Sequence, residues 1–185
     1  MQELKFQLKA AIPGLMRHNL ALLGHYIAAE TMVQDCIEKA LDNHLSWDKN
    51  KPIKPWLYAI LHQSFLEYEP PSDSSGGVDS SLAEYIMRTD PNLANNQQVH
   101  RLMDAVSKLP DEPKEILLLV ILGGLEYRQI SEIVQLPIPK LMAQLHLARK
   151  LLRKYTGDSD DTPIPSTKVS KPDLALVSNS RESIK

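Results

Sequence analysis

The clearest chemical pattern in this sequence is a group of cations in its second half. Lys140, Arg149, Lys150, Arg153 and Lys154 lie in one stretch that contains no acidic residue. Lysine and arginine neutralise phosphates, and cations gathered in one segment are the electrostatic signature of nucleic-acid binding. This stretch is therefore the part of the chain predicted to bind DNA.

The remaining charge is unevenly distributed along the chain. The 185 residues carry a net charge of -2, which argues against an indiscriminate nucleic-acid binder. Residues 98–154 nevertheless hold nine basic and six acidic groups, whereas residues 69–97 hold one basic and five acidic groups. The pattern predicts a basic domain that follows an acidic connector.

Residues suited to catalysis or to metal binding are sparse. Cys36 is the single cysteine of the sequence, and it falls on the apolar side of a helical pattern, so it is predicted to be a small core residue. The sequence has no glycine-rich phosphate loop, no H-E-x-x-H and no C-x-x-C. We therefore predict a protein that is not an enzyme, with no catalytic residue, no cofactor and no metal site.

The chain also lacks a pattern for the membrane. No apolar run approaches the ~20 residues that a membrane span needs. The N-terminal residues show neither an uninterrupted apolar segment nor a small-residue cleavage site, so no signal peptide is predicted. The expected location is the cytoplasm.

Apolar residues at helical spacing predict an all-α fold of two small domains. Residues 1–69 would form the first domain, with one helix beginning near Pro13 and two more over residues 30–45 and 56–68. Residues 98–156 would form the second, with helices over 98–108, 113–123, 127–135 and 139–155. Residues 70–97, rich in Pro, Ser, Gly and acidic groups, are predicted to be a flexible linker, and residues 157–185 a disordered tail.

Two segments together resemble a known family. Residues 16–68, with a VQD tripeptide, a helix ending near HLSW and a WLYAILH helix, resemble the first conserved region of small extracytoplasmic-function sigma factors of the sigma-70 family. Residues 105–152 resemble their promoter-binding region, because an LP pair, an aliphatic run, a G-x-x-Y turn and an I-x-E-I helix follow in that order. The resemblance implies a three-helix region-2-like domain and a four-helix region-4-like domain with a helix-turn-helix.

The resemblance also implies partners and the residues that contact them. The clamp of the largest subunit of RNA polymerase core would bind the helix that carries Val33, Gln34, Asp35 and Glu38. The -10 promoter element would lie against Tyr58, His62 and Gln63. In the second domain, the residues that would contact promoter DNA are Arg128, Lys140, Gln144, His146, Arg149 and Lys150.

The sequence departs from the family pattern where DNA would bind, and this leaves two functions open. Gln63 stands where the family usually has asparagine, and Glu67 and Glu69 follow where it turns basic. Gln144 and Leu147 replace two arginines of the recognition helix. One function is an alternative sigma factor that directs polymerase to promoters. The other is a sigma-like mimic that binds an anti-sigma factor or polymerase without recognising a promoter.

Overall fold

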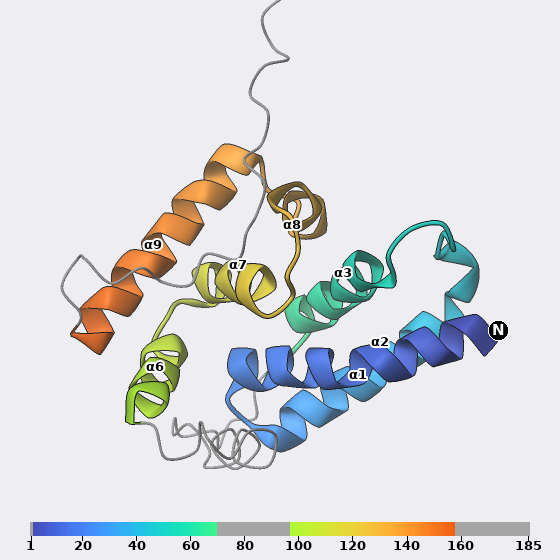
Figure 1. Cartoon of the computed structure of the whole chain (residues 1–185), viewed down its shortest axis with the longest axis horizontal. Coiled ribbons are helices and arrows are strands. Elements are labelled where there is room, and N and C mark those ends of the chain that lie inside the picture. Colours follow the sequence, from blue (N-terminus) through green and yellow to red (C-terminus); the bar gives the residue numbers. More distant parts are fainter. Residues whose placement is uncertain (1, 70–96, 158–185) are drawn as a thin grey trace, which may run out of the picture.

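The structure, a computed structural model, describes residues 2–69 and 97–157. These residues form seven α-helices and one 3-10 turn and contain no strand (Figure 1). The all-α prediction is therefore confirmed. The predicted linker and tail lie outside the described residues, apart from residues 97 and 157.

The first domain consists of α1 (Gln2–Leu23), α2 (Tyr26–Asp42), a 3-10 turn (His44–Ser46) and α3 (Ile53–Leu66). In Figure 1, α1 and α2 lie side by side as a hairpin, and α3 packs against both of them. The predicted start of the first helix near Pro13 is wrong, because α1 begins at Gln2 and contains that proline. Leu4 and Leu8 are buried on the face that also carries Leu15. Their burial offsets the backbone hydrogen bond that proline removes from a helix.

The second domain consists of α6 (Gln97–Ser107), α7 (Asp111–Ile121), α8 (Tyr127–Ile133) and α9 (Ile138–Thr156). Each helix begins and ends within two residues of its predicted bounds. A glycine pair follows α7, and a Cβ added at Gly123 would lie 2.5 Å from the backbone oxygen of Leu119. Any larger residue would therefore disturb the turn that leads into α8.

Helix α7 lies at the centre of the molecule and joins the two domains. Its residues from Pro113 to Val120 are all buried, as expected of a helix that is apolar on most sides. It packs against α9 and α8 within its own domain and against α1 of the first domain. Contacts of α3 with α8 and of α1 with α6 extend this interface. Buried residues of both domains form one continuous core.

Candidate polymerase and nucleic-acid surfaces

Helices α8 and α9 and the turn between them form the helix-turn-helix. The backbone N–H of Glu126, which precedes α8, donates to the side-chain Oε1 of Gln129 at 3.0 Å and fixes the start of that helix. In the turn, Gln135 adopts a left-handed backbone conformation with a φ of 53°. The backbone N–H of Leu136 then donates to the carbonyl of Ser131 at 3.1 Å. These contacts fix the direction in which α9 leaves the turn.

The two sides of α9 differ in chemistry. Its inner side is buried in the core through Leu141, Leu145, Ala148 and Leu152. Its outer side exposes three of the residues predicted to contact DNA, namely Lys140, His146 and Lys150, and Arg149 is half-buried beside them. The helix contains no acidic residue. An exposed, acid-free helix after a short turn has the form that lies in a major groove.

Two other predicted DNA contacts have partners within the protein. Gln144 is half-buried, and its Nε2 donates to Oε2 of Glu112 on α7 at 2.9 Å. The sequence predicts a DNA contact at this position, but in this structure the Gln144 amide is bonded within the protein and does not point freely toward a base. Arg128 is exposed on α8, and its Nε lies 3.5 Å from Oε1 of Glu132. Exposed pairs of this kind are weak, so a phosphate could displace the carboxylate.

The predicted polymerase-binding residues lie on α2, but they do not all face solvent. Gln34, Asp35 and Glu38 are exposed, whereas Val33 is only 6% exposed. The prediction of Val33 as a surface contact is therefore wrong in that respect. Its side chain packs in the core, because position 33 continues the stripe of Ala29, Cys36 and Ala40 that faces the other helices.

A groove runs between α1 and α2 beside these residues. Its volume is about 400 Å³, and it is lined by Ile12, Met16, Tyr26, Glu30, Val33, Gln34, Ile37 and Glu38. Ile12 and Tyr26 remain about two-fifths exposed there. The groove thus offers an apolar surface with two carboxylates. Sequence reasoning found Gln34 and Glu38 but missed Ile12 and Tyr26, which come from the neighbouring helix and the start of α2.

The residues predicted to face the -10 element differ in how exposed they are. Tyr58 is 3% exposed, so its predicted position at the surface is wrong. Its ring meets His18 of α1 edge to face, with ring centroids 5.0 Å apart. Burial raises the pKa of Tyr58 to about 12, so the phenol stays protonated at neutral pH. Gln63 is exposed, as predicted, but its Nε2 donates to Oε1 of Glu67 at 3.2 Å.

His62 makes a contact that crosses the interface between the domains. Its Nδ1 lies 2.7 Å from Oε1 of Glu115 on α7, and the two side chains are only 13% and 7% exposed. The prediction that His62 faces DNA is therefore wrong for this arrangement. Glu115 was missed, although a glutamate inside the apolar run of α7 is itself a signal. A buried carboxylate almost always has a partner.

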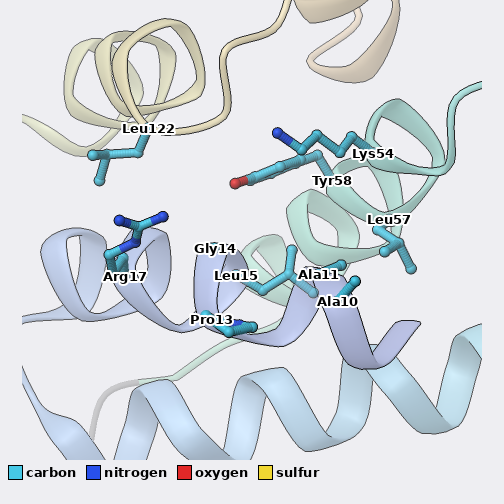
Figure 2. Close-up of a pocket in the computed structure, with 10 residues that line it drawn as sticks. All are labelled: Ala10, Ala11, Pro13, Gly14, Leu15, Arg17, Lys54, Leu57, Tyr58 and Leu122. Atoms are coloured by element: carbon cyan, nitrogen blue, oxygen red, sulfur yellow. The ribbon is translucent and has the colours of Figure 1, made fainter. Parts of the chain in front are cut away.

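A second hollow lies at the same interface (Figure 2). Its volume is about 160 Å³, and it is lined by residues of α1 and α3 and by Leu122, which follows α7. Figure 2 shows Arg17 and the hydroxyl of Tyr58 pointing toward one another across it, with Lys54 beside the tyrosine. No carboxylate lines the hollow, and neither cation forms an ion pair with another described residue.

Comparison with known proteins agrees with this arrangement. The family model for sigma-70 region 4 matches residues 100–152, and the model for the Sigma2 domain of PhyR matches residues 8–62. The two matches follow each other in the order expected of a sigma factor. The chain belongs to the sigma-70 family. Its members are the sigma factors of RNA polymerase, which act in transcription initiation and are not themselves enzymes.

Several relatives are extracytoplasmic-function (ECF) sigma factors. The ECF RNA polymerase sigma factor EcfG of Rhodopseudomonas palustris is 25% identical over 161 residues, which cover 85% of this chain and 88% of the relative. The RNA polymerase sigma factor YlaC of Bacillus subtilis is 27% identical over 135 residues, or 70% of this chain and 78% of the relative. The sigma factor RpoE of Bartonella quintana, solved in complex with the anti-sigma factor NepR, superposes with a TM-score of 0.66 at 18% identity. That match covers 86% of this chain and 99% of the other, and it supports the fold.

Within residues 2–69 and 97–157, no group of three or more histidine, cysteine, aspartate or glutamate side chains could hold a metal ion. None of the helices described by the structure is both long and apolar enough to cross a membrane.

Proposed function

We propose that the chain is an alternative sigma factor that binds RNA polymerase core through α2 and directs it to promoters through α9. The observation that carries this proposal is the outer side of α9, where Lys140, His146 and Lys150 are exposed in a helix without an acidic residue. This helix is the second of a helix-turn-helix in a chain of the sigma-70 family. Lysine binds phosphate or guanine, so the exposed side suits a DNA groove.

The proposed polymerase surface is the exposed side of α2 together with the groove beside it. Asp35 and Glu38 give this surface a negative charge, and the apolar lining of the groove supplies area that a partner can bury. A helical partner with basic residues would fit, because opposite charges orient the contact and apolar burial stabilises it. The clamp of the largest polymerase subunit, implied by the family resemblance, is the partner that we assign to it.

The DNA half of the proposal is tested with a mixed-sequence duplex of 30 base pairs. If α9 neutralises about four phosphates, the logarithm of the binding constant should fall with the logarithm of salt at a slope near -3.6. Replacing Lys140 and Lys150 with alanine should reduce that slope by about 1.8, because two phosphate contacts are lost. The matched control replaces Lys49 and Lys51, two exposed lysines of the first domain, and should leave the slope unchanged.

The polymerase half is tested by charge reversal on α2. Asp35→Arg should weaken binding to purified core polymerase by at least about tenfold, because it places a cation against the basic partner. Asp104→Arg makes the same charge change on an exposed residue of α6 and should have no effect. Unchanged core binding by Asp35→Arg would refute this assignment of the surface.

A second candidate function has its own support. Gln144 is bonded to Glu112, and Leu147 lies on the outer side of α9 with 41% of its surface exposed. Both features reduce the capacity of α9 to contact bases. A sigma-like mimic, whose groove binds an anti-sigma factor, would need only the α2 surface. This function would be favoured if the α9 variant left promoter-dependent transcription unchanged while Asp35→Arg released a small regulatory protein.

A further inference from the structure

The groove between α1 and α2 carries apolar and charged side chains in a regular order. Its apolar lining comes from both helices and consists of Ile12, Met16, Tyr26, Val33 and Ile37. Two exposed carboxylates, Glu30 and Glu38, line it from α2, and in the described part of the chain neither forms an ion pair. They lie eight residues apart, or about 12 Å along the helix axis. An occupant of the groove should therefore place apolar side chains between two cations.

Two long segments of the chain lie outside the described residues, and they differ in charge. Residues 70–96 hold one basic and four acidic groups, so the carboxylates of the groove would repel them. The C-terminal segment begins with three acids, Asp158, Asp160 and Asp161, but residues 162–185 then hold four basic and two acidic groups. Residues 162–185 are therefore the part of the chain outside the structure whose charge complements the groove.

A helix-start pattern precedes the apolar residues of this segment. Ser170 and Asp173 stand at the first and fourth positions of S-K-P-D, and the run L-A-L-V follows directly. Serine at the N-cap with an acidic residue three positions later is the pattern of a capping box, and proline suits the first turn. The sequence thus predicts a short helix over residues 171–181 when the segment is bound. A segment predicted to be disordered on its own can fold in this way on binding.

One side of that helix matches the order of side chains in the groove. Four residues recur at helical spacing, with the two apolar ones between two cations: Lys171, Leu174, Val177 and Arg181. Leu176 falls on the opposite side. The two cations are ten residues apart, or about 15 Å along the helix. This separation is close to that of the two carboxylates, and the long lysine and arginine side chains cover the difference.

The chain between α9 and this segment is long enough to reach the groove. Helix α9 packs against α6, and α6 packs against α1, so one helix separates α9 from the groove (Figure 1). Packed helices lie about 8–10 Å apart. The 13 residues from 158 to 170 can extend over about 43 Å, whereas α1, the longest described helix, is about 33 Å long. The segment can therefore dock without separating the two domains.

Building on the proposed sigma-factor function, we propose that residues 171–181 dock as a helix in the groove between α1 and α2 and compete there with RNA polymerase core. Leu174 and Val177 contact the apolar lining of the groove, while Lys171 and Arg181 pair with its two carboxylates. Polymerase then binds the α2 surface only in the undocked fraction of the protein. The C-terminal segment thereby sets how much of the sigma factor is available to polymerase.

Docking is measured by energy transfer between two dyes on the full chain. Thr31→Cys places one thiol on an exposed position of α2 that does not line the groove. Ser183→Cys places the other just beyond the docking segment. Cys36 is buried, and burial raises the pKa of its thiol to about 12, so it does not compete for the dye. The transfer efficiency gives the ratio of docked to undocked protein.

The apolar contact is tested on the two sides of the predicted helix. Leu174→Asp combined with Val177→Asp should lower the docked-to-undocked ratio at least about tenfold, because both side chains lose their apolar burial. Leu176→Asp makes the same kind of change on the opposite side and should leave the ratio unchanged. Circular dichroism of each variant verifies that the described helices remain folded.

A charge exchange tests the pairing in the groove. Glu30→Lys combined with Glu38→Lys should also lower the docked-to-undocked ratio, and adding Lys171→Glu and Arg181→Glu should restore it. Damage to the fold would not be reversed by substitutions in the segment. The matched control reverses two exposed acids of the second domain, Asp104→Lys and Glu132→Lys. It should leave the ratio unchanged.

The competition arm measures binding to purified core polymerase. The protein with Leu174→Asp and Val177→Asp should bind core more tightly than the unaltered protein, by the factor by which its undocked fraction rises. If the unaltered protein is docked for about nine-tenths of the time, the gain is about tenfold. Leu176→Asp should not change the affinity.

Each outcome decides the proposal. Equal energy transfer in all of the variants would show that the segment does not occupy the groove. Transfer between singly labelled chains after mixing would identify a second copy of the chain as the occupant instead. Loss of docking without a gain in core affinity would refute the competition. The transfer measurements contain no polymerase, so the docking result stands even if Asp35→Arg leaves core binding unchanged.

Discussion

His18 makes the stability of the molecule sensitive to acid. It lies on α1 at the interface with α7, is 1% exposed, and its ring contacts the edge of Tyr58. Burial lowers the pKa of His18 from 6.5 to about 4, and a hydrogen bond to the backbone of Leu118 opposes this shift. The imidazole is therefore neutral in the folded protein at neutral pH.

The sign of the effect follows from the two protonation equilibria. In the unfolded chain His18 takes up a proton near pH 6.5, whereas in the folded chain it does so only near pH 4. Acid therefore favours the unfolded state, and the stability contribution is complete above about pH 6.5 and is lost as the pH falls toward 4. Between pH 7 and pH 5 this single group should cost about 2 kcal/mol of unfolding free energy.

His18→Phe is the variant that isolates this effect. It keeps a ring beside Tyr58 and removes the titrating group. The Leu118 carbonyl keeps its acceptor role after the change, because the backbone N–H groups of Leu122 and Gly123 donate to it at 2.8 Å and 3.1 Å. Urea unfolding of both proteins at pH 7, 6 and 5 gives the free energies. Other groups titrate equally in both proteins, so the difference between the two pH profiles reports His18 alone.

The unaltered protein should lose about 2 kcal/mol more than the His18→Phe protein over this range. If the phenylalanine overpacks the site, its stability falls by the same amount at every pH, which leaves the difference in slope intact. Parallel pH profiles for the two proteins would mean that His18 is protonated or solvated in the folded state, and the interface described above would then be wrong.

Three further predictions test single positions. Cys36 should react with iodoacetamide only after unfolding, because burial raises the pKa of its thiol to about 12; modification of the native protein at neutral pH would contradict this. Asn19 is buried with neither side-chain polar atom bonded to a described residue, so Asn19→Leu should raise the unfolding free energy by about 1 kcal/mol; a loss of stability would reveal an unseen partner. Gln135→Gly should raise it by about 0.5 kcal/mol, since glycine adopts a φ of 53° without steric cost, and a lower urea midpoint would oppose that reasoning.

The helices could be predicted from the sequence because each one buries a stripe with helical spacing. The inner side of α9, formed by Leu141, Leu145, Ala148 and Leu152, is an example that needs no knowledge of its neighbours. The start of α1 was predicted wrongly because proline is common in the first turn of a helix, so Pro13 indicated a helix start. The helix instead begins at Gln2, where the burial of Leu4 and Leu8 stabilises the turns before the proline.

The contacts of α3 could not be predicted in the same way, because they depend on how two domains pack. Periodicity indicates which residues are buried within their own domain. It carries no information about the packing of a second domain against them. A hint was nevertheless present. Trp56, Leu57, Tyr58, Ile60, Leu61 and Phe65 leave α3 apolar around most of its circumference. Such a helix packs on more than one side.

Two of the residues that differ from the family pattern, Gln63 and Glu67, contact one another in this structure. The side-chain Nε2 of Gln63 donates to Oε1 of Glu67 at 3.2 Å, so each of the two side chains has a polar partner at the end of α3. Glu67 also binds Nζ of Lys39 at 3.1 Å, so its charge does not stand alone at the end of the domain. The departures therefore do not by themselves favour a mimic without DNA binding. They are equally compatible with a sigma factor, because Lys39 partly neutralises the carboxylate of Glu67 at the end of the first domain.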